Sequence, residues 1–131
     1  KPKKLMVLWW KKKNKNDLNK HELWLLEGLG KKYSSLASHI EFLKVTQRKI
    51  TGEGMMVSFE YLTSEIEFEE INALFSNGEN IEINKLKKGL SYVIDITSGR
   101  IEYLEFSTYE EKWDGVFGEY KITDKIDYDA K

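Results

Sequence analysis

The stretch Leu90–Phe106, LSYVIDITSGRIEYLEF, decides the fold of this 131-residue chain. Its first eight residues carry large apolar side chains at every second position, which is the period of a β-strand with one buried face. Ser98-Gly99 interrupts the pattern, and a second strand-like run begins at Arg100. Because a glycine-containing pair favours a tight turn, the stretch predicts an antiparallel hairpin. The two faces of its first strand are Leu90, Tyr92, Ile94 and Ile96, opposite Ser91, Val93, Asp95 and Thr97.

A similar pattern upstream predicts another hairpin. Alternation begins at Leu43 and resumes between Met55 and Tyr61, and the loop 51–54 between the two runs contains two glycines. The short runs 81–83 and 120–122 are candidate further strands. Between the hairpins, residues 65–75 partly follow a 3.6-residue period and are a candidate helix.

Helices are expected near the N-terminal end. Asp17 is the expected N-cap of a helix running to about Glu27, with Gly28 and Gly30 as stop signals, and residues 34–40 form a second helical stretch. The order of elements predicts the α+β class: an antiparallel sheet of about five or six strands with N-terminal helices packed on one side.

Composition indicates one domain spanning residues 1–131. Hydrophobic residues make up 40% of the chain and 17 residues are aromatic, which is enough apolar surface for a core. The longest apolar block, Leu5–Trp10, is too short for a membrane helix or a signal-peptide core. With no cysteine, disulfides and thiolate chemistry are excluded, and we expect a cytoplasmic protein.

The net charge of −1 hides a strong asymmetry. Residues 1–49 hold 13 basic and 4 acidic side chains, whereas residues 50–131 hold 8 basic and 18 acidic ones. Only Arg48 and Arg100 offer the planar fork that reads phosphates and guanines best, because the other 19 basic residues are lysines. We therefore expect the two parts of the chain to attract partners of opposite charge.

No residue pattern indicates catalysis. His21 and His39 are the only histidines, expected on a helix surface and at a helix end, and no Gly-x-Ser-x-Gly turn is present. Gly28–Lys32 lacks the spacing of a phosphate-binding loop. The acidic groups at Glu65–Glu70 and Asp124–Asp129 lack the ligand pattern of a metal site. We therefore expect neither an enzyme nor a cofactor.

Two kinds of binding protein stay open. The acidic C-terminal half carries aromatic residues and suits a basic protein partner, such as a nuclease whose cleft is positively charged. The basic segment Lys1–Lys15, with Trp9 and Trp10, suits single-stranded nucleic acid, where lysines follow phosphates and aromatics stack on bases.

A family resemblance favours the first alternative. An Arg-x-x-Thr-Gly-x-Gly hairpin is followed by a Gly-x-x-x-x-Leu-Glu strand and a downstream tryptophan. The matching residues are Arg48, Thr51-Gly52, Gly54, Gly99-Arg100-Ile101, Leu104-Glu105, Tyr109 and Trp113. Over about half of the chain, this pattern resembles the small α+β immunity proteins of bacterial contact-dependent growth-inhibition and related polymorphic toxin systems. The resemblance implies non-covalent inhibition of a toxin, without a cofactor.

The combined expectation is an immunity protein that binds and occludes the C-terminal domain of a bacterial toxin, with a nuclease as the expected class of toxin. The alternative is a nucleic-acid-binding accessory protein that uses the N-terminal segment. The acidic half supplies the expected contact residues for the toxin: Glu102, Glu105, Glu110, Glu111 and Trp113.

Overall fold

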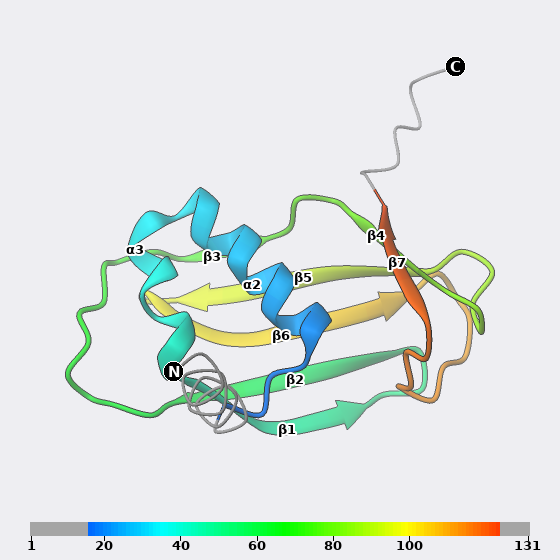
Figure 1. Ribbon diagram of the computed structural model, residues 1–131, viewed down its shortest axis with the longest axis horizontal. Helices are drawn as coiled ribbons and strands as arrows, with labels where there is room; N and C mark the ends of the chain where they lie inside the picture. The colour runs from blue at the N-terminus through cyan, green and yellow to red at the C-terminus, as the bar shows by residue number, and fades with distance from the viewer. Residues whose placement is uncertain (1–15, 124–131) are drawn as a thin grey trace, which may run out of the picture.

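The computed structural model describes residues 16–123 as one antiparallel sheet with helices on one of its faces (Figure 1). The main path of the sheet runs β1-β2-β6-β5-β4-β7, and β3 pairs with β5 beside this path. The expected α+β class, with helices packed on one side, is confirmed. The strands are β1 (Leu43–Ile50), β2 (Gly54–Tyr61), β3 (Ala73–Phe75), β4 (Asn80–Ile83), β5 (Leu90–Thr97), β6 (Arg100–Thr108) and β7 (Tyr120–Thr123).

Both predicted hairpins are present. In the first, the N–H of Thr51 donates to the carbonyl of Gly54 over 2.9 Å and closes the turn between β1 and β2. In the second, Ser98 and Gly99 form the turn between β5 and β6, with φ of 50° and 79°. The second strand of the first hairpin, β2, pairs with the second strand of the other hairpin, β6. This pairing joins the two hairpins into one sheet. The short strands predicted at 81–83 and 120–122 are also confirmed, as β4 and β7.

The first described helix, α2 (Lys20–Lys32), starts and ends later than predicted. Its N-cap is Asn19 rather than Asp17, because Asn19 and Glu22 form a reciprocal capping box with two bonds of 3.1 Å. Gly28 and Gly30 lie inside the helix. A Cβ on Gly30 would come within 3.1 Å of the Ala37 side chain, so this glycine serves close packing rather than helix termination.

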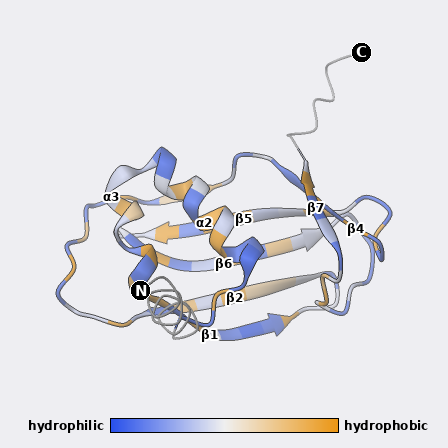
Figure 2. Cartoon of the chain, in the orientation of Figure 1, coloured by the Kyte–Doolittle hydropathy of each residue, from blue (hydrophilic) through white to orange (hydrophobic). Residues whose placement is uncertain are grey.

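The second helical stretch divides into two short helices, α3 (Ser34–Ala37) and the 3₁₀-helix η1 (Ile40–Phe42). Together with α2 they cover the inner face of the sheet. Figure 2 shows that β1 is largely hydrophilic, whereas β2 carries more apolar colour. The core lies between α2 and the inner face, and its fully buried members include Leu25, Leu26, Leu29, Leu43, Val57, Ile81, Leu90, Ile94, Leu104 and Phe106.

The prediction of a helix at residues 65–75 is wrong. Residues 65–72 belong to neither a helix nor a strand and lead into β3. The residues Glu65, Ile66, Glu67, Phe68 and Glu69 alternate between exposed and half-buried, so the side chains follow a period of two. Tertiary hydrogen bonds, described below, hold this segment against the end of the second hairpin.

Candidate binding surface

The outer face of the sheet, opposite the helices, carries some of the predicted contact residues. Glu105 lies at its centre, paired in register with Met56 on one side and Val93 on the other. The next pair along β6 joins Tyr103 to Asp95. All of these side chains are half-buried, and the helices within residues 16–123 pack on the other face. The outer face is therefore a mixed apolar and acidic surface.

Glu102 occupies an irregular position in β6. Ile101 pairs with Ile96 and Tyr103 pairs with Asp95, so Glu102 is the extra residue of a β-bulge. The residue is half-buried and lies near Tyr61. Burial is the main reason that the pKa of Tyr61 is raised, and the charge of Glu102 adds to this shift. Glu102 therefore belongs to the end of β6 that adjoins the β5–β6 turn.

The other three predicted contacts lie at the opposite end of β6, in the loop that follows it. Glu110 is exposed and has a φ of 65°. Glu111 accepts the backbone N–H groups of Lys87 and Lys88, each over 3.0 Å, and these bonds lower the pKa of its carboxyl. Glu111 thus ties the loop after β6 to the loop before β5. The five predicted residues do not form one continuous surface.

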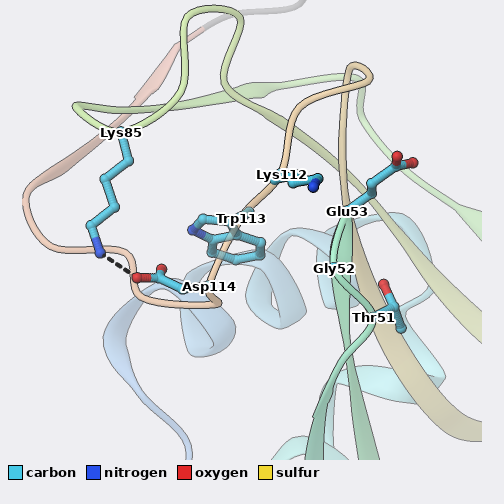
Figure 3. A pocket seen from close by; sticks show the side chains of 7 residues that line it. All are labelled: Thr51, Gly52, Glu53, Lys85, Lys112, Trp113 and Asp114. Atoms are coloured by element: carbon cyan, nitrogen blue, oxygen red, sulfur yellow. Dashed lines mark hydrogen bonds and ion pairs between the residues drawn. The ribbon is translucent and has the colours of Figure 1, made fainter.

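Trp113 is buried, with an exposed fraction of 5%. Its indole N–H donates to the carbonyl of Val116 over 3.0 Å, and its ring packs edge-on against Phe117. Figure 3 shows the indole between the turn containing Gly52 and the ion pair of Lys85 with Asp114. The tryptophan lines an open hollow of about 870 Å³, but little of its own surface is free for a partner.

The strongest concentration of exposed carboxylates is the segment Glu65–Glu70, called here the acidic segment. Its four glutamates are all exposed, whereas Ile66 and Phe68 point partly inward. None of the four glutamates takes part in an ion pair within the described residues, where the two pairs are Arg48 with Glu22 and Lys85 with Asp114. The sequence predicts a solvated acidic face for these residues, which their exposure confirms, but they were not among the predicted contact residues. The period-two alternation of the segment was the available signal.

The acidic segment is held in place along its length. Before it, the N–H of Leu62 donates to the carbonyl of Phe42 over 2.6 Å. In its middle, the carbonyl of Glu67 bonds to Nε2 of His39 over 3.0 Å. After it, the N–H of Gly99 donates to the carbonyl of Ile71 over 2.9 Å. These bonds fix the backbone, so the carboxylates lose less conformational freedom when they bind a partner.

Aromatic side chains pack against Phe68 of the same segment. Phe68 lies edge-on to Tyr61 and His39, with ring centroids 5.1 and 5.3 Å away. The Arg100 guanidinium stands 4.4 Å from the centre of the Phe68 ring and 5.0 Å from that of Tyr61. The Tyr61 hydroxyl bonds to both Nδ1 of His39 and the N–H of Ile101. The segment therefore rests on a packed cluster whose polar atoms are bonded.

Neither histidine has the surroundings of a catalytic base. His39 is buried, its two nitrogens are both bonded, and burial lowers its pKa. His21, expected on a helix surface, is buried and stacks on Phe117 at a centroid distance of 3.7 Å. That expectation is wrong, because the loop after β6 folds back over the start of α2. Within residues 16–123, no group of three histidine or acidic side chains is arranged to hold a metal ion.

The charge of the described part is strongly negative. Residues 16–123 hold 19 acidic and 12 basic side chains, a net charge of −7. The basic segment Lys1–Lys15, with Trp9 and Trp10, lies outside the described residues, as do Asp124–Asp129. The described surface is thus suited to a positively charged partner.

Comparisons with protein-family models, with curated proteins and with solved structures found no match for this chain. Among residues 16–123, no helix is long and apolar enough to span a bilayer.

Proposed function

We propose that this protein is a binding module that neutralises a basic protein, in the manner of an immunity protein that occludes the toxic C-terminal domain of a bacterial toxin in the cytoplasm. The observation that carries the proposal is the acidic segment: four exposed glutamates on a backbone that is fixed by tertiary hydrogen bonds. The family resemblance of the two hairpins adds to it. The proposal requires neither a catalytic step nor a cofactor.

The spacing of the carboxylates suits a nuclease cleft. Alternate positions of the segment place several carboxylates on its exposed side, where they can oppose more than one cationic side chain at once. Glu65, Glu67 and Glu69 occupy such alternate positions. A row of carboxylates at this spacing would oppose the lysines and arginines that normally bind phosphates. Complementary charge of this kind mainly accelerates association and selects the partner.

The proposed contact surface comprises the acidic segment with Glu102 and Glu105. Glu110 is exposed and stays a candidate at the far end of β6. Glu111 and Trp113 have structural contacts of their own and contribute by holding the loop after β6. Removing either residue would thus affect binding through the shape of that loop.

The test uses the C-terminal domain of whatever protein the neighbouring upstream gene encodes. The purified domain is titrated with wild-type protein and with the variant Glu65→Lys/Glu67→Lys/Glu69→Lys, by calorimetry at two salt concentrations. We expect the variant to bind at least about tenfold more weakly and with a smaller salt dependence, because close charge pairs contribute to both.

A matched control distinguishes the effect of the acidic segment on binding from the effect of the protein's net charge. The variant Glu27→Lys/Glu41→Lys/Glu53→Lys makes the same change at three exposed glutamates outside the acidic segment. Equal weakening by both variants would show that only net charge matters and would overturn the surface. Absence of binding between the wild-type protein and the domain would overturn the proposed function.

A further inference from the structure

The outer face of the sheet has apolar side chains that the described helices do not cover. One row of residues paired in register crosses this face: Ser58 in β2, Tyr103 in β6, Asp95 in β5 and Leu74 in β3. Leu74 is 67% exposed, although its neighbour in the row, Asp95, is half-buried. Val93 and Met56 add further apolar groups in the next row. The face therefore offers apolar contact area beside polar groups.

Two carboxylates flank Tyr103 at the centre of this face. Burial is the main reason that the pKa of Tyr103 is raised, and the charges of Asp95 and Glu105 add to this shift. Asp95 accepts the Thr97 hydroxyl over 2.7 Å, and neither carboxylate belongs to an ion pair within residues 16–123. Both carboxylates are thus available to a cationic group.

The cations of the outer face lie at its margins. Lys44 and Lys49 belong to β1, at the edge of the sheet, and Lys44 pairs in register with Glu60. The strands β2, β5 and β6 contain no lysine, and Arg100 stands over the Phe68 ring at the start of β6. The centre of the face therefore carries negative charge that no nearby lysine of these strands offsets.

The basic segment Lys1–Lys15, KPKKLMVLWWKKKNK, has the complementary composition. It contains seven lysines and no acidic residue, and the apolar block Leu5–Trp10 lies between two groups of these lysines. The described residues have a net charge of −7. The segment therefore matches the outer face in both respects, with apolar side chains for the apolar row and cations for the carboxylates.

The point at which the segment joins the fold allows this contact. Asn16 lies at the start of β1, where its amide donates to the carbonyls of Glu41 and Leu43 over 2.8 and 2.6 Å. Within residues 16–123, β1 is the end strand of the sheet. Tyr103 lies two strands in from β1 and about four residues along it, which is about 16 Å from this point. Six extended residues span about 20 Å, so Trp10 can reach the row that contains Tyr103.

We propose that the basic segment folds back over the edge of β1 and docks on the outer face of the sheet of the same chain. The apolar block would lie against Tyr103, Val93 and Leu74, and the lysines on either side of it would oppose Asp95 and Glu105. A segment that is linked to its binding site has a high effective concentration there, so weak individual contacts suffice. This contact requires no other protein and is independent of the proposed function.

The test measures the position of the segment in the full chain by NMR. The chain has no cysteine, so Pro2→Cys gives a single attachment site for a nitroxide label and leaves the seven lysines and the apolar block unchanged. We expect the label to broaden the amide resonances of Val93 and Tyr103 strongly and those of Trp24 and Glu27 in α2 weakly. Broadening centred on α2, or on no particular surface, would overturn the proposal.

A mixed sample identifies which molecule the segment contacts. Spin-labelled chain without ¹⁵N is combined with unlabelled ¹⁵N chain, and we expect no broadening at Val93 or Tyr103. Broadening in the mixed sample equal to that within one chain would show that the segment binds a second copy instead, and would overturn docking within the chain.

Variants of the spin-labelled chain test both parts of the contact. Trp9→Ser/Trp10→Ser and Asp95→Lys/Glu105→Lys should each reduce the broadening at least about threefold, because they remove apolar burial and charge attraction respectively. Glu27→Lys/Glu53→Lys makes the same charge change at exposed residues away from the outer face and should leave the broadening unchanged. If Asp95→Lys/Glu105→Lys fails to fold, the tryptophan variant decides alone. Broadening that neither contact variant reduces would refute the docking.

Discussion

Acid should unfold this protein partly through one buried histidine. His21 is 7% exposed, stacks on Phe117 and lies edge-on to Phe106 and Tyr120. Burial is the main reason that its pKa falls to about 4, and the charge of Arg48 acts in the same direction against that of Glu22. In the unfolded chain the pKa returns to about 6.5.

The sign of the effect follows from proton binding. Between pH 6.5 and pH 4 the unfolded chain binds a proton at His21 that the folded protein does not, so lowering the pH favours unfolding. The stabilisation is complete above pH 6.5 and is lost as the pH falls toward 4. The pKa difference corresponds to at most about 3 kcal/mol, of which about 2 kcal/mol is lost by pH 5.

Urea unfolding, followed by tryptophan fluorescence at about pH 7.5 and pH 5, measures this loss. The variant His21→Phe keeps an aromatic ring in the cluster but cannot titrate, so its free energy of unfolding should fall by about 2 kcal/mol less than that of the wild type over this range. His39→Gln is the control, because it removes the other histidine and leaves His21. If wild type and His21→Phe lose the same free energy, the assignment of the acid sensitivity to His21 is refuted.

Three substitutions test other parts of the fold by the same unfolding measurement. Gly99→Ala places a Cβ 1.9 Å from the carbonyl of Glu69 at a φ of 79° and should cost about 3 kcal/mol. Gly52→Ala has a similar φ but meets no neighbour, so it should cost only about 1 kcal/mol, and equal losses would argue against the clash. Arg48→Ala leaves the fully buried Glu22 without its ion pair and should cost about 3 kcal/mol, against about 1 kcal/mol or less for the exposed Arg100→Ala. Trp113→Ala removes a buried ring and its bond to Val116 and should cost about 4 kcal/mol, and a loss below 1 kcal/mol would contradict its place in the core.

The candidate surface was only partly predictable. Glu102 and Glu105 could be assigned to a strand from alternation, but the bulge at Glu102 shifts the register and has no clear signal in the residues themselves. The conformation of the segment 65–72 was harder to predict, because its residues also follow a helical pattern in part. Hydrogen bonds from His39 and Gly99, both distant in sequence, hold its backbone in a path that is not helical.

Local patterns by themselves determined the two hairpins, their turns and the α+β class, because strand alternation and glycine turns depend on neighbouring residues alone. They also determined the charge asymmetry of the chain. Tertiary structure decided which groups are accessible: Trp113 and His21 are buried, and Gly30 continues a helix against Ala37. Burial depends on contacts between residues far apart in the chain, so no local pattern could assign it.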